Sequence, residues 1–279
     1  MKYVLDRATI DYEAHGEGRP ILLLHGWTMD RRVEIFDYEK IFAARPGWWR
    51  IYPDLPGMGR SVAKAGLSNQ DDVLDSLLAF VDQVLPGRFV LAGTSLGAYL
   101  ARAIAARRRS SIAGLLLRVP CIFAEDARRT LPPFEALVAD EAFMASLDAD
   151  DRAYLGDLLI QTPAYAESLK HKGDAVVQPA IQATAPIANE IRADPKRYGF
   201  SFDLIEAEKT FDEPTLIIAG RRDTTVGYRD AWSILDSYPR ATFVALDRAD
   251  HGWPMETPNL LPALVDDWLE RIARAERGV

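Results

Sequence analysis

The sequence predicts an α/β protein in which helices cover both faces of a mostly parallel central sheet, with a helical cap inserted into the chain. Short apolar runs, each followed by turn residues and then by helical periodicity, recur at both ends of the 279-residue chain. This alternation is typical of such sheets. Several runs are continuous Val, Ile and Leu, as expected of strands buried on both faces. A proline-rich, helical stretch at 123–211 interrupts the alternation.

The strands are expected where the apolar runs lie. Six of them should pair in the central sheet, at 20–25, 49–53, 88–92, 112–119, 215–219 and 241–246. Before them, 3–6 and 8–13 should form an antiparallel pair at the sheet edge. Helices are expected at 71–85, 96–107 and 259–273, because apolar residues recur there at the spacing of one helix face.

The chain is expected to divide into a core and a cap. The core comprises 1–122 and 212–279, and it carries all the expected strands. The cap comprises 123–211, which lacks a convincing strand and is punctuated by Pro132-Pro133, Pro163, Pro179, Pro186 and Pro195. A hydrophobic fraction of 48% is that of an ordinary folded protein, and a chain of this length buries a large core.

Composition narrows the class of partner to a small-molecule substrate. The net charge of −8 argues against nucleic-acid binding, and the run Arg107-Arg108-Arg109 stands where a helix ends and complements its dipole.

Cys121 is the only cysteine, so it forms no internal disulfide and is interpreted as structural, with a small pocket-lining role left open. No apolar leader or membrane-spanning stretch is evident. We therefore expect a cytoplasmic protein without a membrane partner, and the sequence does not indicate its oligomeric state.

The strongest chemical motif is Gly93-Thr94-Ser95-Leu96-Gly97. It directly follows the expected strand 88–92 and directly precedes the expected helix 96–107, which is the context of a nucleophile elbow. A sharp turn there lifts the Ser95 hydroxyl clear of the sheet, while the two glycines let strand and helix pack closely. The motif therefore predicts Ser95 as a nucleophile.

A serine hydroxyl needs a histidine to accept its proton and an acid to hold that histidine. We select His251, in a glycine-containing loop after the last strand, rather than His15, His25 or His171. We select Asp223, which follows the strand 215–219, over Asp247 and Asp250, because those two are poorly placed to reach around the ring. The residues at the end of the run 112–119, Val119-Pro120-Cys121, offer no rival acid. The order Ser95, Asp223, His251 is that of α/β-hydrolases.

The remaining parts are an oxyanion hole and a pocket. The backbone N–H groups of Leu96 and Trp27 are the expected oxyanion donors, since Leu96 follows the nucleophile and Gly26 lets the backbone at Trp27 approach the substrate. The expected pocket residues are His25, Phe123 and Trp253, with Leu96 and the cap aromatics Phe134, Phe143 and Tyr154. No metal cluster or dinucleotide motif is evident, so we expect no cofactor.

Together these motifs resemble the α/β-hydrolase family from Gly18 to about Leu269. Besides the elbow, His25-Gly26-Trp27 is similar to the family's His-Gly oxyanion motif, and Asp54-Leu55-Pro56-Gly57-Met58-Gly59-Arg60-Ser61 is similar to its Asp-x-x-Gly-x-Gly-x-Ser loop. The resemblance implies structural roles for Asp54 and Ser61, a triad of Ser95, Asp223 and His251, and a cap at about 123–211. The α/β-hydrolase family also includes enzymes with an aspartate nucleophile, but the serine at position 95 argues against membership in those groups.

The expected function is hydrolysis of a small carboxylic ester through an acyl-enzyme on Ser95. Two alternatives use the same residues: cleavage of a carbon–carbon bond next to a ketone, as in aromatic degradation, and cleavage of a lactone. A third alternative is of a different class, namely a ligand sensor that keeps the pocket and signals through its cap. The fold by itself does not choose among these substrates.

Overall fold

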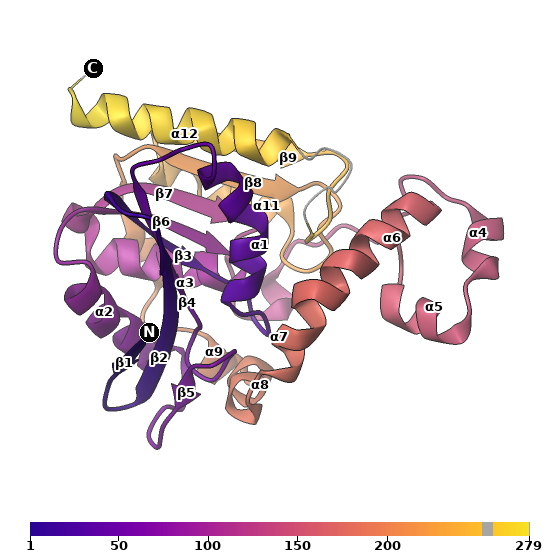
Figure 1. Cartoon of the computed structure of the whole chain (residues 1–279), viewed down its shortest axis with the longest axis horizontal. Helices are drawn as coiled ribbons and strands as arrows, with labels where there is room; N and C mark the ends of the chain where they lie inside the picture. Colours follow the sequence, from indigo (N-terminus) through magenta and orange to yellow (C-terminus); the bar gives the residue numbers. More distant parts are fainter. Residues whose placement is uncertain (253–258, 279) are drawn as a thin grey trace.

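The fold is built on one sheet with helices on both faces (Figure 1). A computed structural model describes residues 1–252 and 259–278 of the chain. The order of strands across the sheet is β1-β2-β4-β3-β6-β7-β8-β9, and the short strand β5 pairs with β2. The strands are β1 (Lys2–Val4), β2 (Ala8–His15), β3 (Arg19–Leu24), β4 (Trp48–Pro53), β5 (Val62–Ala63), β6 (Phe89–Thr94), β7 (Ile112–Arg118), β8 (Thr215–Gly220) and β9 (Ala241–Leu246).

The pairing confirms the predicted parallel sheet and its antiparallel edge. Strand β3 pairs in parallel with both β4 and β6, and the parallel pairing continues through β7 and β8 to β9. Strand β2 is antiparallel to β1 and to β4. The carboxyl ends of the parallel strands consequently meet at one edge, where open α/β sheets carry their sites.

Apolar side chains of the central strands pack into two separate hydrophobic cores, one on each face of the sheet. Successive residues of a strand point to opposite faces, so Leu22 and Leu24 enter the larger core with α2 and α3, while Ile21 and Leu23 enter the other core with α1 and α12. The helices of the two faces are α1 (Arg31–Phe42), α2 (Gln70–Val84), α3 (Leu96–Arg107), α11 (Tyr228–Ser233) and α12 (Leu260–Glu276). The helices predicted at 71–85, 96–107 and 259–273 are therefore confirmed as α2, α3 and α12.

Helix α1 is not evident from the sequence pattern, and its buried face explains why. The helix begins after Asp30, whose side chain accepts a hydrogen bond from the N–H of Arg32. Its buried positions include the ionisable residues Arg31, Glu34 and Asp37 beside ordinary apolar ones. Charged side chains are almost never fully buried unless paired, so these positions are readily mistaken for solvent-facing ones.

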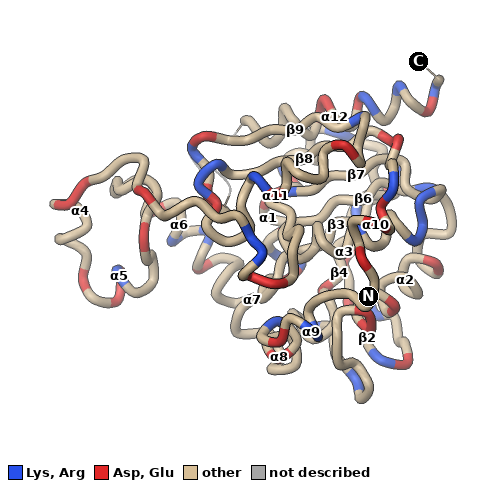
Figure 2. Tube along the Cα trace, turned by 180° about the vertical axis from the view of Figure 1, so that it is seen from behind, with Lys and Arg blue, Asp and Glu red and all other residues tan. Residues whose placement is uncertain are grey.

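Charged residues of both signs are interspersed over the sheet and the helices that cover it. Figure 2 shows that the outlying segment at 140–157 differs, since its charged positions are mostly acidic. Two residues of the basic run after α3 have local partners, since Arg108 pairs with Asp82 at 2.6 Å and Arg107 lies over the Phe202 ring at 4.5 Å. Among the described helices, none is both long and apolar enough to cross a membrane.

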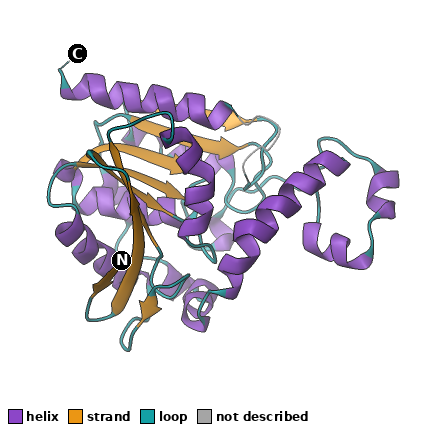
Figure 3. Ribbon diagram, in the orientation of Figure 1, coloured by secondary structure: helices purple, strands orange, loops and turns teal. Residues whose placement is uncertain are grey.

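A long helical segment lies between β7 and β8. Its elements are α4 (Glu141–Ser146), α5 (Ala149–Leu155), α6 (Pro163–Lys172), a π-helical segment (Gly173–Val177), α7 (Gln178–Gln182), α8 (Pro186–Ala193), α9 (Pro195–Tyr198) and α10 (Leu204–Glu208). Pro163, Pro186 and Pro195 each occupy the first helical position, where a missing N–H costs nothing. Figure 3 shows α6 running outward from the sheet toward α4 and α5. The division into a core and a cap at 123–211 stays a prediction.

Candidate active site

The turn between β6 and α3 places Ser95 in a strained conformation. Its φ is +55° and its ψ is −113°, a combination that non-glycine residues adopt rarely and mostly at functional sites. The flanking glycines are sterically required. A Cβ at Gly93 would lie 2.3 Å from the carbonyl oxygen of Gly97, and a Cβ at Gly97 would lie 2.1 Å from that of Leu24. Close packing of strand and helix thus sets the exposure of the Ser95 hydroxyl.

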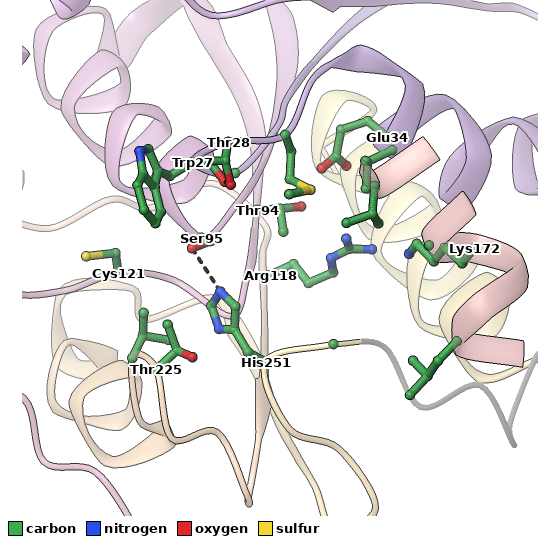
Figure 4. Close-up of a pocket in the computed structure, with 18 of the residues that line it drawn as sticks. Trp27, Thr28, Glu34, Thr94, Ser95, Arg118, Cys121, Lys172, Thr225 and His251 are labelled. Atoms are coloured by element: carbon green, nitrogen blue, oxygen red, sulfur yellow. Dashed lines mark hydrogen bonds between the residues drawn. The ribbon is translucent and has the colours of Figure 1, made fainter. Parts of the chain in front are cut away.

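The structure brings together the three residues that the sequence selects as a triad. The Ser95 hydroxyl lies 3.0 Å from Nε2 of His251, and Nδ1 of the same ring lies 2.9 Å from Oδ2 of Asp223 (Figure 4). With the proton on Nδ1, the imidazole donates to the carboxylate and its Nε2 accepts from the serine hydroxyl. The arrangement can therefore move a proton from Ser95 to His251.

Asp223 is held as a carboxylate acceptor in a buried turn after β8. Its other oxygen accepts hydrogen bonds from the N–H groups of Thr225, at 2.8 Å, and Val226, at 3.0 Å. Burial alone would raise the pKa of Asp223, but the charge and hydrogen bond of His251 and the two N–H groups outweigh it, so the pKa lies below its ordinary value. An ionised Asp223 in this position can stabilise a positive charge on the His251 ring.

The rival acids lie elsewhere. One oxygen of Asp250 accepts from the N–H of Gly252 within the histidine loop at 2.6 Å, and Asp247 is exposed. The turn that holds Asp223 and the loop that holds His251 approach each other closely at Gly220, where a Cβ would lie 2.1 Å from the carbonyl oxygen of Asp250. A glycine at the end of β8 therefore lets the loop of His251 approach the turn of Asp223.

The two expected oxyanion donors flank Ser95. Leu96 is the first residue of α3, so its N–H has no partner within the helix. On the other side lies the loop after β3, where a Cβ at Gly26 would lie 3.4 Å from Cβ of Ser95. The Trp27 side chain lines the cavity above the serine. Leu96 and Trp27 therefore both lie next to Ser95, whose Oγ is the atom that would attack a substrate carbonyl.

The prediction of His25 as a pocket residue is wrong. The ring is fully buried beneath the oxyanion loop, with Nδ1 at 2.7 Å from the carbonyl oxygen of Gly26 and Nε2 accepting from the N–H of Leu55 at 2.9 Å. Burial lowers the pKa of His25, which keeps the imidazole neutral and able to donate to one loop and accept from the other. His25 therefore joins the loop after β3 to the loop after β4 and does not line the cavity.

The prediction of Phe123 as a pocket residue is also wrong, because its ring packs against the larger core and under Arg128, 4.4 Å from the guanidinium carbon. Of the cap aromatics, Tyr154 lines the cavity, whereas Phe134 is 44% exposed and Phe143 packs in a small cluster within the helical segment. The side chain of Leu96 enters the core instead. Trp253 lies outside the described residues.

Asp54 and Ser61 take structural parts, as the resemblance implies. Asp54 accepts from the N–H of Arg31 at 2.9 Å, from its guanidinium at 2.7 Å and from the N–H of Arg60 at 2.7 Å. The Ser61 hydroxyl donates to the carbonyl of Asp54 at 2.7 Å and accepts from the N–H of Asp11 at 2.8 Å. These contacts fix the loop after β4 against the loop that carries Trp27.

Ser95 and His251 open into a cavity of about 530 Å³. Apolar groups such as Met29, Val33, Leu155 and Val177 form part of its wall, and Cys121 contributes its buried thiol. Burial raises the pKa of Cys121, so the thiol stays protonated and inert there. The pocket-lining role left open for Cys121 is the one that the structure gives it.

Several charged residues of the cavity escape sequence reasoning. Glu34, Arg118, Arg129, Lys172 and Arg192 all line it. A signal existed for Arg118, since it is the one charged residue in the apolar run 112–119. Lys172 directly precedes the π-helical segment, a feature that often marks functional sites. Within the described residues, no group of three or more His, Cys, Asp or Glu side chains could hold a metal ion.

Comparison with known proteins shows to which family this chain belongs. The sequence profile of the alpha/beta hydrolase family matches residues 21–261, which is most of the chain. This chain belongs to the alpha/beta hydrolase family. The protein is therefore a hydrolase, and the predicted fold class is confirmed.

The relatives named next are distant in sequence but cover more than nine tenths of this hydrolase. The AB hydrolase superfamily protein YisY of Bacillus subtilis is 23% identical over 93% of this chain and 95% of its own. A pimeloyl-[acyl-carrier protein] methyl ester esterase of Shewanella woodyi is 21% identical over 95% of this chain and 99% of its own. The crystal structure of an alpha/beta superfamily hydrolase from Oenococcus oeni PSU-1 covers 98% of this chain and 99% of its own, with a TM-score of 0.82 and 23% identity. At such identity the structural likeness concerns the fold alone.

Proposed function

We propose that this hydrolase cleaves small carboxylic esters through an acyl-enzyme on Ser95. The observation that carries the proposal is the continuous hydrogen-bonded series from Asp223 through His251 to Ser95, with distances of 2.9 and 3.0 Å, in which Ser95 and His251 line the cavity. The esterase name of one full-length relative supports the ester as substrate. The position of Ser95 on the cavity wall supports a small-molecule substrate.

The reaction proceeds in two halves. Ser95 Oγ attacks the ester carbonyl carbon while its proton passes to Nε2 of His251, and the carbonyl oxygen becomes an oxyanion held by the N–H groups of Trp27 and Leu96. The carbon–oxygen bond to the alcohol then breaks as His251 returns the proton to the leaving oxygen. In the second half water attacks the acyl group, its proton passes to His251, and the acid leaves as Ser95 regains its proton.

Asp223, the oxyanion donors and the N-terminus of α3 each contribute to this reaction in a different way. Asp223 keeps the Nδ1 proton on the imidazole facing it, so that Nε2 is the free base. Each backbone donor of the oxyanion hole contributes roughly 3 kcal/mol of transition-state stabilisation. The Ser95 hydroxyl lies at the positive end of α3, where negative charge is favoured.

Hydrolysis of p-nitrophenyl acetate by the wild type and by Ser95→Ala tests the proposal. We expect the variant to lose at least three orders of magnitude in kcat, as removal of a nucleophile does in such triads. Ser110→Ala is the matched control, because Ser110 is exposed beyond the far end of α3. Equal rates for wild type and Ser95→Ala would contradict the proposal.

The substrate panel includes the alternatives that need the same serine. A vinylogous diketone acid and an acyl lactone are offered beside simple esters. We expect the highest kcat/KM with the esters. Turnover of the diketone acid without ester turnover would replace the ester proposal by carbon–carbon cleavage, and failure of a fluorophosphonate probe to label Ser95 would favour a sensor.

A further inference from the structure

One wall of the cavity is built from buried charged groups that the hydrolytic steps do not use. Glu34 comes from α1, Arg118 from the end of β7 and Lys172 from the end of α6. In Figure 4 these three side chains gather on one side of the cavity, with Thr94 between them and Ser95. We call these three residues the polar wall.

The polar wall adjoins the nucleophile. Arg118 is the register partner of Thr94 across β6 and β7, and its carbonyl oxygen accepts from the N–H of Ser95 at 2.9 Å. Aligned residues of neighbouring strands point to the same face. The side chain of Arg118 therefore enters the cavity beside that of Thr94, the residue that precedes Ser95.

The two cations of the polar wall share one carboxylate behind it. Nη1 of Arg118 lies 2.7 Å from Oδ2 of Asp37, and Nζ of Lys172 lies 2.6 and 2.8 Å from the two oxygens of the same residue. Arg118 is 8% exposed and Lys172 is 13% exposed. Asp37 and an ionised Glu34 together balance the two cations, so the cluster carries one surplus positive charge only when Glu34 is protonated. A guanidinium also has five N–H donors, so donors remain for a further acceptor.

The remaining acid of the wall has an incomplete set of contacts. Glu34 is 1% exposed, and its Oε1 has no hydrogen-bond partner. The Thr94 hydroxyl interacts with both Glu34 and the Tyr38 hydroxyl, but neither contact has the geometry of a full hydrogen bond. Unpaired buried polar groups are costly and uncommon in native proteins. Glu34 and Thr94 line the cavity whereas Tyr38 does not, so the incomplete contacts of Glu34 and Thr94 point to a polar group of a ligand.

The opposite wall is different, since its cations are already occupied. Arg129 donates to the carbonyl oxygens of Phe123 and Thr225, each at 3.0 Å, and pairs with Asp126 at 2.7 Å. Arg192 also pairs with Asp126, at 2.8 Å. The polar wall is thus the part of the cavity that combines buried cations with unsatisfied partners.

We propose that the polar wall binds a free carboxylate carried by the ester substrate, so that the preferred substrates are monoesters of dicarboxylic acids. Arg118 and Lys172 donate to the carboxylate, and Glu34 donates to it in its protonated form. When a monoanion binds and Glu34 takes up a proton, the two cations face Asp37 and the ligand carboxylate, so the buried charges still balance. This inference rests on the proposed ester hydrolysis at Ser95 and names its substrate class.

The charges around Glu34 agree with this binding mode. Burial raises the pKa of Glu34 to about 6, although Arg118 and Lys172 oppose the rise and Asp37 adds to it. A carboxyl group with that pKa takes up a proton readily when a second anion arrives beside it. The same burial lowers the pKa of Lys172, which its contact with Asp37 opposes.

The test compares monomethyl adipate with dimethyl adipate, which share a chain and differ in one free carboxylate. Wild-type kcat/KM should favour the monoester, and Lys172→Gln should reduce the monoester-to-diester ratio by about tenfold or more, as expected for loss of a charge-assisted hydrogen bond. Lys172→Arg should restore much of the ratio. The matched control is Lys170→Gln on the same helix, where the side chain pairs with Asp151 instead; it should leave the ratio unchanged.

A second measurement needs no variant. Inhibition of wild-type turnover by adipate should be at least about tenfold stronger than inhibition by adipamide, which is neutral and of the same length. A wild-type preference for the diester, equal inhibition by the two compounds, or equal ratios for Lys172→Gln and Lys170→Gln would overturn the proposal. If neither ester is hydrolysed, the proposed function fails by itself, and calorimetric binding of adipate against adipamide still decides the subsite.

Discussion

Replacement of Glu34 by Gln should stabilise the folded protein at alkaline pH. Glu34 is 1% exposed, and burial raises the pKa of its carboxyl group from the ordinary value of 4.5 to about 6 despite the opposing charges of Arg118 and Lys172. A folded pKa above the unfolded one means that ionisation favours the unfolded state. The stability lost as pH rises through this window is therefore a cost of keeping an ionised carboxylate in place.

The magnitude follows from the two pKa values. Their difference of about 1.5, at about 1.36 kcal/mol for each pKa unit, gives roughly 2 kcal/mol. The full cost applies above pH 7, where the group is ionised in both states, and it vanishes below pH 4, where the group is protonated in both. At pH 5 the same relation leaves less than about 1 kcal/mol. A glutamine keeps the size and polarity of the protonated acid without its charge.

Urea unfolding of wild type and Glu34→Gln at pH 8 and pH 5 measures the effect. The variant should exceed the wild type by about 2 kcal/mol at pH 8 and by less than half of that at pH 5. Glu17→Gln, at an exposed turn position, should show no such change with pH. A variant that is less stable than the wild type at pH 8 would refute the reasoning, because ionised Glu34 would then be a net stabilising partner of Arg118 and Lys172.

Three further substitutions probe other parts of the molecule. Asp223→Asn should lower kcat by about three to four orders of magnitude without unfolding the protein, because the imidazole loses its correct tautomer, whereas Asp250→Asn should lower kcat less than tenfold in the same ester assay. Gly97→Ala should destabilise the fold by at least about 3 kcal/mol in urea, since its Cβ would lie 2.1 Å from a β3 carbonyl oxygen; a stable variant would contradict this packing. Arg102→Met should cost about 3–5 kcal/mol, because it leaves the buried carboxylate of Glu208, now 2.5 Å from the Arg102 guanidinium, without its cation; a much smaller loss in thermal or urea unfolding would contradict this.

The sheet and the nucleophile turn are predictable because their signals are local. An apolar run such as Leu22-Leu23-Leu24 shows burial on both faces within a few residues, and Gly93 and Gly97 report directly that strand and helix pack closely. The placement of Asp223 and His251 also follows from local features, since each stands in a turn after a parallel strand. Their meeting at one sheet edge is a consequence of parallel pairing.

The polar wall is not predictable in the same way because its members meet only in three dimensions. Glu34, Asp37, Arg118 and Lys172 come from three elements far apart in the chain, and each alone resembles a solvated charge. Pairing across α1, β7 and α6 allows their burial. The charge of Arg118 inside an apolar strand was the one local sign of it.

The two wrong pocket residues show a related limit. His25 lies at the right edge of the sheet, but its ring turns inward because the N–H of Leu55, thirty positions along the chain, offers it a donor. Phe123 follows β7 closely, yet the apolar core beneath α3 offers its ring more contact than the cavity does. Proximity in sequence to a catalytic element therefore does not fix the direction of a side chain.

The most direct test of the central claim is to trap the acyl group. Wild-type protein is mixed with p-nitrophenyl acetate, quenched in acid within the first turnover and digested, and the peptides are examined by mass spectrometry. We expect one acetyl group on Ser95, absent from Ser95→Ala and absent after long incubation, when water has released it. An acetyl group on another residue, or turnover by Ser95→Ala at the wild-type rate, would contradict an acyl-enzyme on Ser95.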